Sequence, residues 1–150
     1  MNKLLNIEDF TDGLQLTVSE NSDINLTNFL NTFERYYCSL HFGDKFTSEI
    51  YNKLDDEHYS EVISNVKNIL KYYIFFYYVR EKSVSFVSNI PGDSISENPE
   101  KTDNFNNQLA QRYNLGVHLH NNFLKSFDFS FMENLPIMKK QKTIMTVLNF

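Results

Sequence analysis

The chain has 150 residues, of which 41% are hydrophobic and 15% aromatic, and it carries a formal net charge of −5. This apolar content excludes wholesale disorder, and the length suffices for one domain with its own core, so we expect residues 1–150 to form a single domain. The acidic balance argues against a general nucleic-acid-binding protein, which would usually be basic.

Glycine and proline are scarce, with 4 and 3 residues, which favours helices over a turn-rich β-sandwich. Cys38 is the single cysteine, so no internal disulfide can form, and a reducing compartment is the simplest setting. The N-terminal residues lack an apolar run of signal-peptide length, because Glu8 and Asp9 interrupt it early. We therefore expect a cytoplasmic protein.

The first third of the chain predicts one short strand and two helices. Alternating apolar and polar side chains are typical of a strand over residues 14–18. Apolar residues then recur every three or four positions over residues 25–41, which predicts a helix that Asp23 caps and Gly43 ends. A shorter helix is expected over residues 47–54.

The most informative segment is an aromatic run near the middle of the chain, residues 71–80. Its inner residues are all apolar or aromatic, and a charged residue closes each end. The run is far shorter than the ~20 residues that cross a bilayer, so we expect it in a protein core and not in a membrane. From Tyr59 to Tyr77 the apolar stripe predicts a helix over residues 57–82, with a surface first half and a central second half.

The second half of the chain mixes loop, helix and strand signals. We expect a short strand at residues 84–86, a polar loop over residues 88–103, and a helix over residues 103–114 that Gly116 ends. Residues 117–131 fit either a helix or a strand, because both periodicities are present.

Pro136 is a favourable first residue for a final helix. Together these elements predict a mainly α fold. We expect a single helical domain around the central aromatic helix, with or without a small β element, and an α+β domain is the alternative.

His118 and His120 form the pattern closest to a metal site, because both would point the same way if they stood on a strand. A third ligand would have to come from elsewhere in the chain, from His41, His58 or Asp128. Since zinc sites usually show richer clusters, we expect no bound metal and no cofactor.

Cys38 and His41 are three residues apart on a predicted helix, so they are neighbours on one face. A nucleophilic cysteine needs a base and a lowered pKa, and a mid-helix position between apolar neighbours is a poor setting for both. We expect Cys38 to be a buried structural residue.

The charge is unevenly spread along the chain. Residues 1–61 hold 12 acidic and 4 basic side chains, a net of −8, whereas residues 62–150 hold 7 acidic and 10 basic side chains, a net of +3. An acidic face suits a basic partner. The candidate partner-binding residues are Glu49, Asp55, Asp56, Glu57 and Glu61. The alternative is that they are helix caps and a solvated surface.

No phosphate-binding glycine loop and no nucleophile-elbow motif occurs in the chain. The leading hypothesis is a non-enzymatic cytoplasmic binding protein that neutralises or regulates a basic partner protein. A toxin-immunity protein and a phage or viral inhibitor are examples of this class. One alternative is a small metal-dependent enzyme that uses His118 and His120. Another is a secretion chaperone or assembly subunit, which would form a homodimer.

Overall fold

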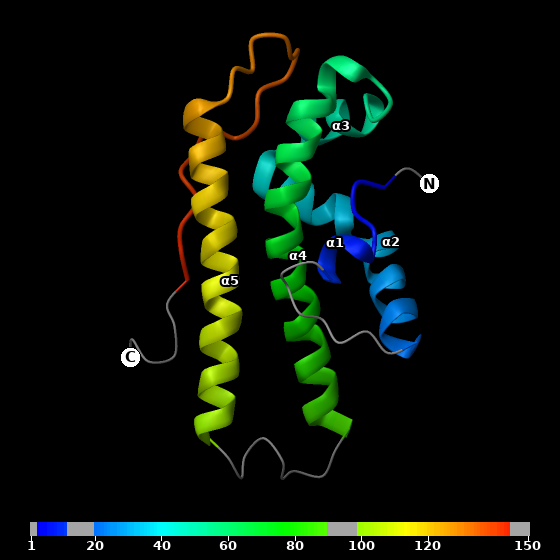
Figure 1. The fold of residues 1–150 in the computed structure, drawn as a ribbon, viewed down its shortest axis with the longest axis vertical. Helices are drawn as coiled ribbons and strands as arrows, with labels where there is room; N and C mark the ends of the chain where they lie inside the picture. The colour runs from blue at the N-terminus through cyan, green and yellow to red at the C-terminus, as the bar shows by residue number, and fades with distance from the viewer. Residues whose placement is uncertain (1–2, 12–19, 90–98, 145–150) are drawn as a thin grey trace.

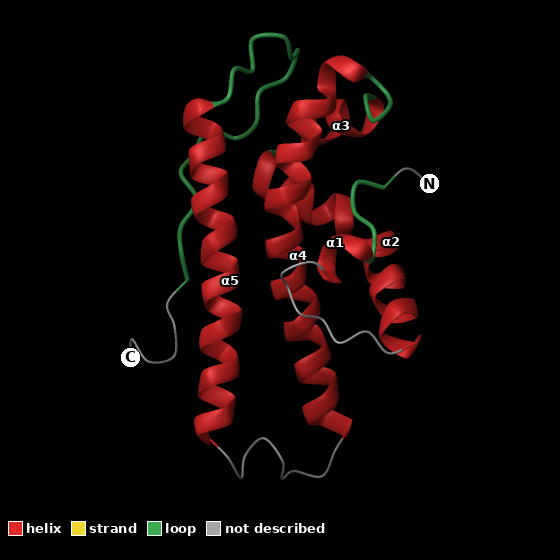
Figure 2. Ribbon diagram, in the orientation of Figure 1, coloured by secondary structure: helices red, strands yellow, loops and turns green. Residues whose placement is uncertain are grey.

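Helices are the only regular structure among the residues that the computed structural model describes, which are 3–11, 20–89 and 99–144. The mainly α class is therefore confirmed (Figures 1 and 2). In chain order the elements are α1 (Glu8–Thr11), α2 (Glu20–Phe42), α3 (Asp44–Asn52), the 3-10 turn η1 (Glu57–Tyr59), α4 (Ser60–Asn89) and α5 (Pro99–Ser126).

The two longest helices, α4 and α5, lie side by side and antiparallel (Figure 1). Helices α1 and α2 pack against α4, and α3 packs against α2. The predicted central helix is confirmed, and it is longer than residues 57–82. Most of the aromatic run over residues 72–79 is buried, as expected for a segment with apolar side chains around its whole circumference, while Tyr72, Tyr77 and Val79 are partly buried. Among the side chains of α4 that the structure describes, the buried ones are Val62, Val66, Ile69, Leu70, Tyr73, Ile74, Phe75, Phe76 and Tyr78.

The helical hairpin corrects three predictions for the second half of the chain. The strand at residues 84–86 is wrong, because α4 continues to Asn89. The loop predicted over residues 88–103 is too long, since α4 runs to Asn89 and α5 begins at Pro99. Gly116 does not end a helix, because α5 continues through it to Ser126. Since Gly116 has no side chain, Tyr72 of α4 can pack closely against it. Residues 90–98 lie outside the described part.

Helix α2 confirms the helix predicted over residues 25–41, but it begins earlier, at Glu20. Asp23 therefore lies inside the helix and does not cap it. The strand expected over residues 14–18 falls outside the described residues. The short helix expected over residues 47–54 is confirmed as α3, displaced by a few residues towards the N-terminus.

Gly43 makes the sharp corner between α2 and α3. Its backbone φ is +98°, a conformation that residues with a side chain rarely adopt. Its N–H donates to the Ser39 carbonyl at 2.8 Å, and its own carbonyl accepts from the Thr47 N–H at 3.0 Å. One residue thus closes α2 and opens α3, which confirms the predicted end of the first long helix.

After α5 the chain crosses the end of the hairpin and then returns as an extended segment beside α5 (Figure 1). We call residues 137–144 the strap. The Ile137 N–H donates to the Phe42 carbonyl at 2.9 Å, and further backbone groups of the strap pair with side chains of α5. The final helix predicted from Pro136 is therefore wrong over residues 136–144, because these backbone groups bond to other elements.

Within the described part of the chain, no helix is both long and apolar enough to cross a membrane.

Candidate functional site

The five acidic residues predicted to bind a partner do not form one surface. Asp55, Glu57 and Glu61 are exposed around η1 and the start of α4. Asp56 is half-buried, and its carboxylate accepts the His58 N–H at 2.9 Å, so it caps η1. Glu49 is buried with 7% of its surface exposed, and it is not part of the exposed face.

Glu49 instead holds the loop that follows α5. Its carboxylate accepts the Tyr59 hydroxyl at 2.8 Å, the Asn134 N–H at 2.7 Å and the Glu133 N–H at 3.2 Å. Burial acts to raise the pKa of Glu49, but these hydrogen bonds together lower it below its ordinary value. The ionised side chain therefore fixes η1 to the loop.

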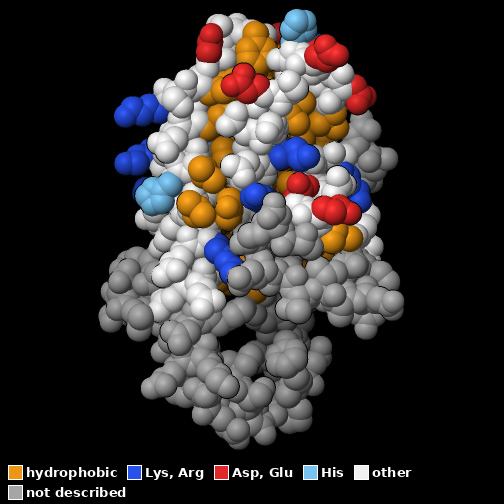
Figure 3. All heavy atoms as spheres, in the orientation of Figure 1, with side chains coloured by type: hydrophobic (Ala, Val, Ile, Leu, Met, Phe, Trp, Pro, Cys, Tyr) orange, Lys and Arg blue, Asp and Glu red, His pale blue; other side chains and the backbone are white. Residues whose placement is uncertain are grey.

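Between η1 and this loop lies a groove of about 740 Å³, open to solvent. It forms where the start of α4 and the end of α5 come together, and Figure 3 shows acidic side chains gathered at this end of the molecule. We call it the acidic groove. It is lined by Asp56, His58, Tyr59, Glu61, Ser126, Phe127, Asp128 and Phe131.

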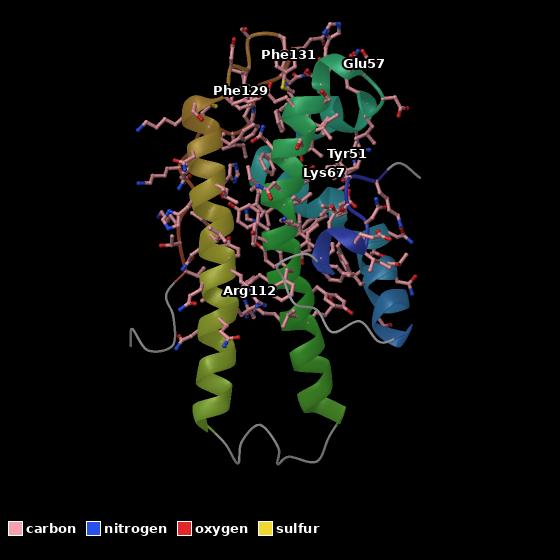
Figure 4. All side chains as sticks on the ribbon, viewed as in Figure 1. Tyr51, Glu57, Lys67, Arg112, Phe129 and Phe131 are labelled. Carbon is pink, nitrogen blue, oxygen red and sulfur yellow. The ribbon has the colours of Figure 1, made fainter. Side chains whose placement is uncertain are left out.

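An aromatic wall runs along one side of the acidic groove. The Phe131 ring lies edge-on to Tyr59, with centroids 5.2 Å apart, and to Phe127, with centroids 6.2 Å apart. Phe129 is buried and packs against Phe127, with ring centroids 4.9 Å apart. Phe131 itself keeps 43% of its surface exposed, at the same end of the molecule as Glu57 (Figure 4). A partner side chain could therefore cover it.

The electrostatics of the acidic groove favour a cation. Three carboxylates line it, from Asp56, Glu61 and Asp128, against the single imidazole of His58. The Ser130 side chain and its N–H lower the pKa of Asp128, so this carboxyl stays ionised. The Ser126 hydroxyl donates to the Asn122 carbonyl at 2.7 Å. The hydroxyl of Ser126 in the groove lining is therefore already bonded within α5. The three carboxylates suit the binding of a basic group.

His118 and His120 do not stand on a strand as the metal hypothesis required. Both lie on α5, where residues two apart point in different directions. His118 is exposed, whereas His120 is fully buried and its Nδ1 lies 2.9 Å from the Tyr73 hydroxyl. The described residues contain no group of three or more His, Cys, Asp or Glu side chains placed to hold a metal ion.

A buried layer of histidine and tyrosine rings joins α2, α4 and α5. The His41 ring stacks on Tyr73, with centroids 3.8 Å apart, and its Nε2 lies 3.0 Å from the Tyr77 hydroxyl. Its Nδ1 lies 3.2 Å from the Gln141 side-chain oxygen on the strap. Burial lowers the pKa of His41 to about 4 and that of His120 to about 3. Both imidazoles are therefore neutral core groups at physiological pH.

Cys38 is fully buried, and the Thr47 hydroxyl donates to its sulfur at 3.4 Å. Burial raises the pKa of this thiol to about 12, which opposes formation of the thiolate that a nucleophile needs. His41 makes its hydrogen bonds to Tyr77 and Gln141 and none to Cys38.

Sequence reasoning missed the asparagines that bind the strap. Asn121 pairs with both backbone groups of Gln141, and Asn114 pairs with both backbone groups of Ile144. The sequence does carry a pattern that could have indicated them: Asn114 and Asn121 are seven residues apart on one helix and so lie on one face. It is invisible to a hydrophobic-pattern search because asparagine is polar.

Comparisons of this chain with protein-family models, with curated proteins and with solved structures return no match. Its function is therefore inferred from the geometry of the described residues.

Proposed function

We propose that this protein is a non-enzymatic binding protein that neutralises or regulates a basic partner protein, and that a basic segment of the partner docks in the acidic groove. The observation that supports this most directly is the pairing of three groove carboxylates with the exposed ring of Phe131. A toxin-immunity protein or a phage or viral inhibitor would act in this way, by covering the partner's working surface.

The chemistry of the groove matches an arginine side chain best. A guanidinium can stack on an aromatic face and at the same time donate two parallel hydrogen bonds to a carboxylate. The groove offers both kinds of group within one hollow, with Phe131 on one side and Glu61 and Asp128 nearby. Aromatic residues that are partly buried in the free protein are also typical anchors of protein interfaces.

Charge distribution supports the same partner class. The net charge of −8 over residues 1–61 makes this part of the chain attractive to a basic protein at a distance. Electrostatic steering acts mainly on the association rate and weakens with salt, whereas aromatic contact acts mainly on the dissociation rate. The two contributions can therefore be measured separately.

The test begins with affinity capture from the cells that produce the protein, followed by binding kinetics with the purified partner. The groove variant is Glu61→Lys with Asp128→Asn, which keeps an oxygen to cap Ser130. The matched control is Asp44→Lys with Glu81→Gln, which changes the net charge by the same three units on exposed residues outside the groove. Thermal unfolding of both variants checks that the fold is kept.

We expect the groove variant to associate more slowly and with weaker salt dependence than the control, and Phe131→Ala to dissociate faster. Equal association rates for the two charge variants would place the binding surface elsewhere. Isolation of an acidic partner, or of a homodimer as the working form, would favour the secretion-chaperone or assembly-subunit alternative. No observation on the described residues favours an enzyme that uses His118 and His120 together.

A further inference from the structure

The segment that follows α5 carries a large share of the exposed apolar side chains. Among the residues that the structure describes, four of the seven exposed large hydrophobic side chains lie between positions 131 and 138. Phe131 is one of them, and it lines the acidic groove. The other three are Leu135, Ile137 and Met138, which we call the apolar ridge. Single exposed apolar residues are ordinary, whereas a concentration of them on one short segment is typical of a surface that binds another protein.

Hydrogen bonds hold the backbone of this segment beside and within the apolar ridge. Just before the ridge, the Glu49 carboxylate accepts the Asn134 N–H at 2.7 Å. Within the ridge, the Ile137 N–H donates to the Phe42 carbonyl at 2.9 Å. The ridge side chains are thus exposed from a backbone that other elements hold in place. A partner that covers them gains apolar burial without first having to order the segment.

Charges of opposite sign flank the apolar ridge along the chain. On its N-terminal side is the acidic groove, which is lined by the carboxylates of Asp56, Glu61 and Asp128. On its C-terminal side the strap carries three exposed lysines, which we call the strap lysines: Lys139, Lys140 and Lys142. The surface therefore changes from acidic through apolar to basic. An apolar centre with a polar and charged rim is the usual composition of a protein interface.

The acidic groove, the apolar ridge and the strap lysines are close enough to belong to one interface. Phe131 and Lys140 are nine residues apart, so their Cα atoms would lie at most about 32 Å apart in a fully extended chain. Their true separation is smaller, because the segment after α5 doubles back at the end of the molecule (Figure 1). A standard interface covers about 800 Å² of each partner, which is a patch about 30 Å across. One partner can therefore contact all three parts.

We propose that the docking surface for the partner continues from the acidic groove across the apolar ridge to the strap lysines. This inference rests on the proposed function and adds the chemistry of the occupant. The occupant is a surface of the basic partner that presents, in order, a basic side chain to the groove, apolar side chains to the ridge and acidic side chains to the strap lysines. Because the strap lysines repel a surface that is basic throughout, they also fix the direction in which the partner docks.

The apolar ridge is tested by the dissociation rate of the partner, obtained by affinity capture and purified. Leu135→Ala with Met138→Ala removes two ridge side chains and leaves Ile137, whose N–H binds the end of α2. The matched control is Tyr36→Ala with Leu40→Ala, which removes two similarly exposed apolar side chains from α2. We expect the ridge variant to dissociate roughly tenfold faster than the unaltered protein, or faster still, and the control to dissociate at the unaltered rate. Equal rates for the two variants would overturn the proposal.

The strap lysines are tested by the association rate, for which the sign of the change is decisive. Lys140→Glu should slow association roughly twofold or more at low salt, because it repels the acidic part of the partner, and added salt should reduce the difference. Arg80→Glu on α4 is the matched control, since it changes the net charge by the same two units at another exposed position. It should not slow association. A partner surface that is basic throughout would instead bind Lys140→Glu faster, and that result would contradict this inference.

Comparison with the groove variant separates failure of this inference from failure of the proposed function. If Glu61→Lys with Asp128→Asn slows association while the ridge variant and Lys140→Glu match their controls, the partner occupies the groove alone and this inference is wrong. If the groove variant also matches its control, the proposed function is wrong as well. Thermal unfolding of every variant checks that the fold is kept.

Discussion

Gly116 on α5 lies against Tyr72 on α4 so closely that a Cβ atom added to the glycine would stand 2.8 Å from the Tyr72 Cβ. The carbonyl oxygen of Ile69 would be 3.6 Å away. Because the nearest atom is the first carbon of a side chain, it cannot move without moving α4 itself. The missing side chain thus sets how closely the two long helices approach.

Gly116→Ala should therefore destabilise the protein, although alanine is the better helix former. The helix-propensity gain is about 1 kcal/mol, and overpacking of a tight contact costs about 1–3 kcal/mol with the helices forced apart. We expect a net loss in the free energy of unfolding, measured by urea titration. Leu115→Ala, at an exposed position on the same helix, should change stability little. A gain in stability for Gly116→Ala would contradict the close packing.

Stability should fall as the pH is lowered from 7 to 5, because of His41 and His120. Their pKa values are lowered from 6.5 to about 4 and about 3, so in this range the unfolded chain binds protons that the folded chain does not. Linkage gives a loss of about 2 kcal/mol for each histidine between these pH values. Burial raises the pKa of Glu34, which offsets part of this loss, since the folded state takes up that proton more readily.

Urea titrations at a series of pH values check this prediction, with His41→Gln and His120→Gln as the informative variants. Each should reduce the slope of stability against pH. His118→Gln, at an exposed position two residues from His120, should retain the full slope. If all three variants kept the wild-type slope, the acid sensitivity would come from other groups.

Glu34 should be essential to the attachment of the N-terminal segment. Its buried carboxylate accepts the Leu4 N–H at 2.6 Å and the Tyr51 hydroxyl at 2.6 Å. Glu34→Ala leaves both donors unsatisfied, so we expect a loss of about 2–4 kcal/mol in denaturant titration. Tyr51→Phe removes one of them, and the double variant should cost less than the sum. Strict additivity would show that the two residues are not coupled.

Glu49 should act as a positioning residue for the acidic groove and not as a partner contact. Glu49→Gln replaces an ionised acceptor of four donors with a weaker one, so amides of residues 131–135 should exchange faster with solvent. The exposed Glu57→Gln is the matched control and should leave these amides unchanged. Unaltered exchange in Glu49→Gln would show that the loop is held by its aromatic contacts alone.

Phe76→Ala should cost about 3–5 kcal/mol in the free energy of unfolding, because the ring is buried with 8% of its surface exposed. It lies against Tyr113 of α5 with centroids 4.8 Å apart. Tyr36→Ala is the control, since Tyr36 keeps 60% of its surface exposed. A loss near zero in denaturant titration would mean that the central helix is wrongly placed.

The amino-acid pattern alone determined the helical class, the two helices α2 and α4, and the buried aromatic half of α4. These follow from the local spacing of apolar side chains, which any helix must bury on one face. The cap at Asp56 and the corner at Gly43 also follow from local chemistry. The Asp56 carboxylate accepts an N–H two residues away, and Gly43 adopts a positive φ because it has no side chain, so neither feature needs a distant partner.

Only the tertiary structure decided the roles of Gly116, Glu49 and the strap. A glycine inside a helical pattern can either end the helix or allow a neighbouring helix to approach closely. Gly116 has the second role because Tyr72 of α4 lies against it. An acidic residue can be exposed on the surface, or it can be buried and hold other segments in place. Glu49 has the second role because hydrogen-bond donors such as Tyr59 and Asn134 surround it. The strap is extended because its backbone hydrogen bonds go to Asn114, Asn121 and Phe42, which are distant in sequence.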